Sequence, residues 1–142
     1  MANSAGFANA SKLAALAAIV DGKSIKAALY LASASVDHTT PAYTTSGEVS
    51  SAGTGYTAGG IAVTNATSAA ESGGTAYWTP SANLSFGTVT LTAAFDAVML
   101  YDTGASNRNL GVFTFGSQTV TAAPFTLATP TNDSSTGLLR IG

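Results

Sequence analysis

The hydrophobic residues of the chain follow two different periods, and the change comes near residue 24. Upstream of it, apolar residues recur at spacings of three and four, as on one face of an α-helix: Leu13, Leu16, Ala17 and Val20. Asn9 or Ser11 is a suitable N-cap, and Gly22 stands where a helix commonly ends. A short, Ala-rich helix is marginal in isolation. We therefore expect it to pack on its own domain or, alternatively, on a neighbouring subunit.

From Ser24 onward the period is two, which predicts β-strands. Residues 25–31 alternate, with the odd-numbered side chains on one face and the even-numbered ones on the other. Residues 82–95 also alternate, but the apolar positions change from even to odd at Gly87. A change of phase at a glycine inside a strand predicts a β-bulge.

Further strands are expected on both sides of this segment. Residues 96–101 and 109–115 are apolar at nearly every position, which predicts central strands covered on both faces. Shorter strands are expected in the remaining apolar segments, at 59–67, at 75–80, on either side of Pro124 and at 138–141. Eight to ten strands at this spacing indicate an all-β fold, a β-sandwich or jelly-roll-like domain with one short N-terminal α-helix.

The domain organisation follows from this pattern. Residues 1–23 are expected to form an arm, flexible over 1–9, and the short helix, while residues 24–142 form a single β-sandwich domain. Residues 37–60 are too rich in Gly, Ser and Thr to be core. We expect them to be a long excursion with short edge pairings near Tyr43 and Val49.

The composition restricts the possible partners. Ala, Gly, Ser and Thr supply 80 of the 142 residues, charged residues only 8%, and the net charge is −2. The five basic residues are dispersed, so we expect no nucleic-acid binding. No apolar run reaches the ~18 residues that a membrane span requires, so no membrane association is expected. A nearly uncharged surface is suited to contact with copies of itself or with a larger assembly.

The strongest candidate for chemistry is Asp102, which follows an apolar run and begins an Asp-Thr-Gly motif like that of aspartic proteases. Such an enzyme needs two carboxylates that share a proton. In the dimeric proteases the motif lies early in the domain, whereas only 40 residues follow Asp102. Asp, Gly, Ser and Asn are also typical of a polar turn between two strands. We therefore interpret residues 102–109 as a turn and expect no enzymatic activity.

The other candidate motifs are weaker. Residues 53–58, "GTGYTA", have the letters of a dinucleotide fingerprint but lack the flanking strand and helix. His38 is the single histidine, and we expect it to be exposed in a turn. Asp96, Asp102 and Asp133 are too scattered to indicate a calcium site. No catalytic residue, metal or cofactor is expected. Trp78 with neighbouring tyrosines could offer a stacking platform for a sugar, although a lone Trp more commonly packs in a core.

Residues 24–142 resemble a group of small virion proteins of tailed bacteriophages. The resemblance is carried by "IKAALYLASAS", by "GTGYTAGG" followed by "AYW", by an apolar strand that ends in Tyr-Asp, by "FGSQTV" and by the closing "LLRIG". It implies a β-rich, multimeric, non-enzymatic component of the particle, and it carries no catalytic residues over to this chain. The N-terminal helix lies outside the matched part.

The expected function is that of a virion structural protein, made in the host bacterial cytoplasm and located in the virion. The expected partners are copies of itself, as a homo-oligomer, and major capsid or tail subunits. A capsid decoration (cement) protein is favoured; the alternatives are a tail or baseplate accessory protein and a carbohydrate- or receptor-binding β-module using residues 37–60. The candidate assembly interface consists of Leu13, Leu16, Val20, Tyr43 and Tyr56.

Overall fold

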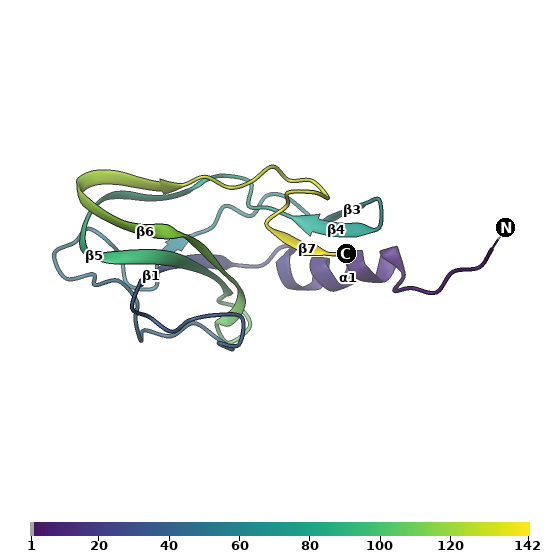
Figure 1. The fold of residues 1–142 in the computed structure, drawn as a ribbon, viewed down its shortest axis with the longest axis horizontal. Helices are drawn as coiled ribbons and strands as arrows, with labels where there is room; N and C mark the ends of the chain where they lie inside the picture. Colours follow the sequence, from purple (N-terminus) through teal and green to yellow (C-terminus); the bar gives the residue numbers. More distant parts are fainter. Residues whose placement is uncertain (1) are drawn as a thin grey trace.

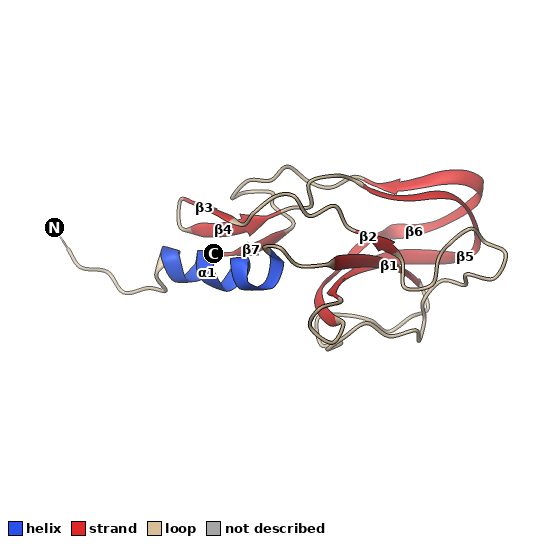
Figure 2. Cartoon of the chain, turned by 180° about the vertical axis from the view of Figure 1, so that it is seen from behind, coloured by secondary structure: helices blue, strands red, loops and turns tan. Residues whose placement is uncertain are grey.

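A computed structural model describes residues 2–142 of the chain, so that Met1, the first residue of the expected arm, lies outside the described residues. These residues form α1 (Asn9–Val20), β1 (Ile25–Leu31), β2 (Ile61–Ala62), β3 (Ala70–Ser72), β4 (Thr75–Trp78), β5 (Leu84–Asp102), β6 (Arg108–Leu127) and β7 (Leu139–Ile141). One antiparallel sheet has the order β2-β1-β5-β6, and a smaller one has the order β3-β4-β7. Figures 1 and 2 show α1 beside the smaller sheet. The predicted all-β fold with one short helix is confirmed.

The strands are fewer than the sequence predicts, and two of them are much longer. The strand predicted over 59–67 is reduced to Ile61–Ala62, and Ala70–Ser72 forms a short strand that was not predicted. The segments on either side of Asp96 form one strand, β5, of 19 residues, and the segments between Asn109 and Leu127 form β6, of 20 residues. The β-bulge predicted at Gly87 is confirmed, because the register shifts between Ser85 and Thr88 and the φ of Gly87 is 69°. The register shifts again between Leu91 and Ala97. Bulges let a strand bend without ending, so each change of pattern is a bend and not a strand terminus.

The β5–β6 hairpin curls over at the end of the molecule away from α1 (Figure 1). Phe95, in the middle of β5, and Phe125, near the end of β6, meet edge to face with ring centroids 5.0 Å apart. Phe115 contacts both, at 5.9 Å from each. One folded hairpin therefore supplies two layers with the main core between them.

Each face of β1 is buried by a different core. Ile25, Ala27 and Leu29 belong to the main core, whereas Ala28 and Tyr30 belong to a smaller cluster on the opposite face. The smaller cluster also contains Ala97, Met99 and Tyr101 from β5. The odd–even alternation predicted for β1 is thus confirmed, and both of its sides face inward.

Residues 37–60 form the predicted long excursion, and their two isolated pairings lie next to the predicted positions. Ala42 pairs with Arg108, and Glu48 pairs with Tyr30. The expectation that this segment contributes nothing to the core is wrong. Val49 and Tyr56 are each only 4% exposed, because the segment folds back against the sheet.

Helix α1 occupies the predicted residues and packs within its own chain. The predicted side-chain N-cap is wrong: the N-cap is Ala8, whose carbonyl accepts hydrogen bonds from the backbone N–H groups of Ser11 and Lys12. Gly22 follows the end of the helix with a φ of 64°, as predicted. The predicted boundary between residues 23 and 24 falls in the turn between α1 and β1.

Strand β6 differs from its prediction in one further respect. Residues 109–115 were expected to be covered on both faces, but all are half-buried or exposed. The reason is topological, since β6 lies at the edge of the four-stranded sheet.

Candidate functional site

Asp102 belongs to the turn that joins β5 and β6. It is the last residue of β5 and pairs with Arg108, the first residue of β6. Its Oδ1 accepts a hydrogen bond from the backbone N–H of Gly104 at 2.9 Å, and its Oδ2 lies 3.6 Å from Arg108 Nη2. The turn interpretation of this motif is confirmed, and only 2% of the Asp102 side chain is exposed. Its carboxylate holds together the two ends of its own hairpin.

The other two motifs lie in loops. Residues 53–58 form turns, with no helix after them to receive a phosphate group. His38 is exposed, as predicted, in the turn at residues 37–40. The neighbouring Asp37 accepts hydrogen bonds from the hydroxyl and the backbone N–H of Thr39, at 2.6 and 2.7 Å. These bonds hold the pKa of the Asp37 carboxyl below its usual value.

Trp78 has no exposed surface. Its Nε1–H donates to the Oδ1 of Asn65 and to the carbonyl oxygen of Thr67, and Nε1 lies 3.1 Å from each acceptor. The Nδ2 group of Asn65 in turn donates to the carbonyl oxygens of Val20 and Lys23, which links the end of α1 to β4. The idea of a sugar-stacking platform on Trp78 is therefore wrong, because the ring is enclosed in the main core.

The five residues of the predicted assembly interface do not lie together. Leu16 and Val20 are buried in the main core, where α1 packs on the smaller sheet, and Leu13 is half-buried beside them. Tyr56 is buried in the same core, while Tyr43 is half-buried against the smaller cluster. The stripe on α1 thus follows the first of the two alternatives, packing on its own domain. Leu16, Val20 and Tyr56 are therefore core residues, and the five residues do not form one surface.

A cluster of polar groups around Glu48 is the feature that sequence reasoning missed. One oxygen of the carboxylate, Oε1, accepts hydrogen bonds from the Tyr56 hydroxyl and from the backbone N–H of Gly59, both at 2.7 Å. The other oxygen, Oε2, accepts from the Tyr43 hydroxyl at 2.6 Å. Three donors therefore converge on one half-buried carboxylate, and all three come from residues 43–59.

The tyrosines of this cluster also hold the excursion against the sheet. The Tyr56 hydroxyl accepts a hydrogen bond from the backbone N–H of Leu29 in β1 at 3.0 Å. From β5, the Tyr101 hydroxyl donates to the Gly59 carbonyl at 2.6 Å. The ring of Tyr101 stacks on that of Tyr43, with centroids 4.6 Å apart. Glu48 is thus the centre of a network that joins the excursion to two strands.

The network shifts the ionisation of its tyrosines in one direction. Burial raises the pKa of Tyr30 to about 12, with a smaller contribution from the negative charge of Glu48. Burial and the hydrogen bond to Glu48 also raise the pKa values of Tyr43 and Tyr56. Burial and the charge of Glu48 raise the pKa of Tyr101. A tyrosine with a raised pKa stays neutral at ordinary pH, so these hydroxyls act here as hydrogen-bonding groups.

One signal in the sequence could have revealed this cluster. Glu48 is the only charged residue between His38 and Glu71, and Tyr43 and Tyr56 lie on either side of it. A single carboxylate within such a neutral segment needs local donors if it is not fully exposed. The two strand tyrosines, 30 and 101, could not be assigned to it without the fold.

The free edge of β6 is the second notable feature. Residues 40–43 cover only its beginning, where the backbone N–H of Asn109 donates to the Pro41 carbonyl at 3.0 Å. Beyond Asn109, β5 is the only strand in residues 2–142 that pairs with β6, so its other edge has no strand partner. Residues 109–127 carry no charged side chain. An unprotected edge strand is a template for pairing with another chain.

Within residues 2–142 no three His, Cys, Asp or Glu side chains gather where they could hold a metal ion. No helix in this part of the chain has the length and apolar character needed to cross a membrane.

Comparison with known proteins finds no relative of this chain. No family model matches the chain. Searches of curated protein sequences and of solved structures likewise find no significant match.

Proposed function

We propose that this chain is a non-enzymatic structural protein of a tailed-bacteriophage virion, and specifically a capsid decoration protein that binds on or between coat subunits. The observation that carries the proposal is the uncharged, open edge of β6. Proteins that work as free monomers usually protect such an edge with charges, bulges or covering segments. A bulge at Leu110 and a change of register between Thr114 and Gln118 interrupt β6, and Pro124 and the positive φ of Ala122 disturb its later half. Residues 111–114, in continuous register between these interruptions, have no such protection.

The charge distribution supports association in the same way. Residues 49–70, 72–95 and 109–132 contain no charged side chain, although many of their residues are exposed. Surfaces of this kind can meet another protein without the cost of removing water from charges. Association alone does not specify the partner. The sequence resemblance of residues 24–142 to small phage virion proteins narrows it to a phage particle.

The test is an add-back experiment with particles that lack this protein. Purified wild-type chain is added at increasing concentration, the particles are separated from free protein, and their resistance to heat is measured. We expect binding that saturates and a higher temperature of genome release. Separating heads from tails before the assay identifies the part that binds, and saturation on tails alone would favour a tail accessory role. Absence of saturable binding to either would refute the proposal.

A further inference from the structure

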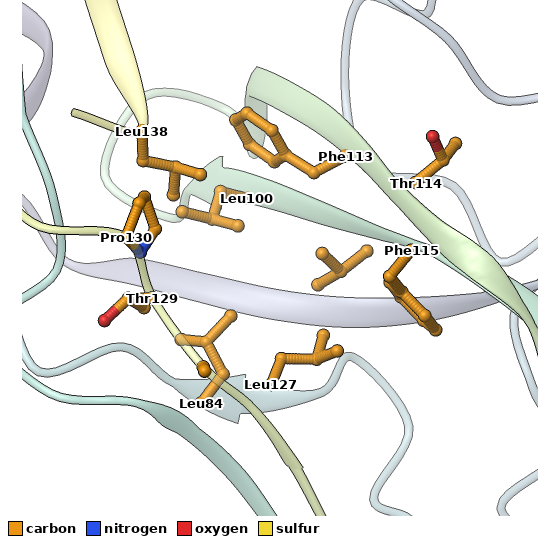
Figure 3. Close-up of a pocket in the computed structure, with 11 residues that line it drawn as sticks. Leu84, Leu100, Phe113, Thr114, Phe115, Leu127, Thr129, Pro130 and Leu138 are labelled. Atoms are coloured by element: carbon orange, nitrogen blue, oxygen red, sulfur yellow. The ribbon is translucent and has the colours of Figure 1, made fainter. Parts of the chain in front are cut away.

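An apolar slot opens beside β6, between the two layers of the folded hairpin. Figure 3 shows apolar side chains from both layers and from the segment before β7 turned toward one space. This space has a volume of about 150 Å³. Its apolar lining includes Leu84, Leu100, Phe113, Phe115, Leu127 and Leu138. None of the lining residues is charged. An apolar cavity of about this volume is large enough to bind a benzene ring.

The same chain carries an aromatic ring that has no place in its own core. Phe7 is 61% exposed and is the one large hydrophobic side chain so exposed in residues 2–142. It lies on the extended segment 2–8, which leaves the body beyond the start of α1 (Figures 1 and 2). Residues 2–11 contain no charged side chain. Ring and slot are thus matched in size and in their lack of charge.

Phe7 cannot reach the slot of its own chain while α1 is intact. The start of α1 lies by the β3–β4 turn, where Lys12 Nζ donates to the Gly74 carbonyl at 2.7 Å. The other end of α1 lies near Trp78, to which Asn65 links it by hydrogen bonds. Trp78 pairs with Leu139, and Leu138, the residue before it, lines the slot. The slot is therefore near the end of α1 that is far from Phe7. The 12 residues of α1 span about 18 Å. The Cα atom of Phe7 lies at most about 7 Å from that of Asn9, and even with its side chain added the ring does not reach the far end of α1.

We propose that Phe7 of one copy inserts into the slot of a second copy of this chain. The proposal rests on the proposed function, since it names the contact by which copies associate. Each copy offers one ring and one slot on different parts of its surface, so the contact is head-to-tail and generates either a closed ring or a chain of subunits. The free edge of β6 lies beside the slot and can pair with the backbone of the incoming segment.

Two variants separate the ring from the slot. Phe7→Ala removes the ring and leaves the slot open. Ala128→Arg places a long charged side chain at an exposed position of the slot lining and leaves the ring in place. In sedimentation at high protein concentration, the wild type is expected to associate and each variant alone to be monomeric. An equal mixture is expected to form a heterodimer, because only one productive contact is then possible.

The site of contact is checked by NMR on the full chain. Isotope-labelled Phe7→Ala is titrated with unlabelled Ala128→Arg, and the expected result is saturable shifts of the amides of Phe113, Leu127 and Leu138. The control titrant is the unlabelled double variant, which has neither ring nor open slot and should cause at least tenfold smaller shifts. The spectrum of Ala128→Arg alone reports its folding. If it is unfolded, Ala128→Gln, a milder enlargement at the same exposed lining position, replaces it.

The outcomes distinguish this inference from the proposed function. A wild type that stays monomeric up to about 1 mM, the range of weak binding, overturns the inference. The inference is also overturned if Ala128→Arg shifts the amide signals of labelled Phe7→Ala no more than the double variant does. If wild-type protein nevertheless saturates phage particles, the proposed function stands and only the ring-in-slot contact fails. If the heterodimer forms but no particle binds the protein, the contact stands and the virion role fails.

Discussion

The Glu48 carboxylate accepts a hydrogen bond from the Tyr56 hydroxyl at 2.7 Å, and that same hydroxyl accepts one from the Leu29 backbone at 3.0 Å. This relay connects the middle of a Gly-, Ser- and Thr-rich excursion to a central strand. It explains how a segment with few apolar side chains is held along the edge of β1, with Tyr56 in the main core and Tyr43 against the smaller cluster. A charged acceptor replaces part of the missing hydrophobic contact.

Replacement of Glu48 by Gln tests this relay. The amide retains one acceptor oxygen but replaces the other with a donor, so the hydrogen bonds from Tyr43 and Tyr56 cannot both persist. Because hydrogen bonds to charged groups contribute about 1.5–3 kcal/mol, we expect the free energy of unfolding to fall by about 2 kcal/mol, measured by urea denaturation. The control is Glu71→Gln, whose carboxylate accepts one bond, from Gly74 in a β-hairpin turn. Equal effects of the two substitutions would contradict the central role of Glu48.

The tyrosine network predicts a loss of stability at alkaline pH. The folded state raises the pKa of Tyr30 to about 12 and also raises those of Tyr43, Tyr56 and Tyr101, whereas an unfolded tyrosine titrates near 10. The stabilisation is therefore fully present below pH 10 and is lost as the pH rises through 10 to 12 and beyond. We expect the urea midpoint to fall across this range, together with a late rise of tyrosinate absorbance. Tyr56→Phe should reduce this fall. Ionisation of all five tyrosines near pH 10 in a protein that remains folded would contradict the network.

Gly60 is the glycine whose replacement should be most damaging. Its φ is 79°, and a Cβ atom on it would lie 1.8 Å from the carbonyl oxygen of Ala27 in the neighbouring strand β1. We expect Gly60→Ala to destabilise the fold by more than about 3 kcal/mol, because both the backbone conformation and the contact would have to change. Gly53→Ala is the matched control: its φ is 69°, but the space around it is open. It should cost about 1 kcal/mol. Thermal unfolding of the two variants compares them directly.

The stripe on α1 should contribute to folding and not to assembly. Leu16 is 1% exposed, so Leu16→Ala should lower the free energy of unfolding by about 2–5 kcal/mol. Ala14→Ser, at an exposed position of the same helix, should change it by less than about 0.5 kcal/mol. A Leu16→Ala protein with unchanged stability but reduced association would reverse this assignment.

The features that the sequence predicted well are those with a local cause. The stripe of α1, the bulge at Gly87 and the turn after Asp102 each arise from a spacing or a residue type within a few positions. Sequence reasoning did not predict that β5 continues past Phe95. Its bulges interrupt the alternation in the same way as a loop would, and only pairing with β6 shows that the strand continues.

The Glu48 network could not be predicted for a related reason. Tyr101 and Gly59 are 42 positions apart, and Tyr56 and Leu29 are 27 apart, so the fold alone brings them together. The burial of Trp78 likewise depends on α1 and Asn65 meeting at β4. Composition gave the correct general indication that charge is scarce, but it did not show that one edge strand would be left both open and uncharged.

The copy number of this protein in purified phage particles tests the central claim most directly. Quantitative mass spectrometry of particles washed at high salt measures the ratio of this chain to the major coat protein. If the chain is a decoration protein, it should be present at a fixed ratio of the same order as the coat protein, and the ratio should not fall on washing. A chain found only in the soluble fraction of the lysate, with none retained on the particles, would contradict the claim.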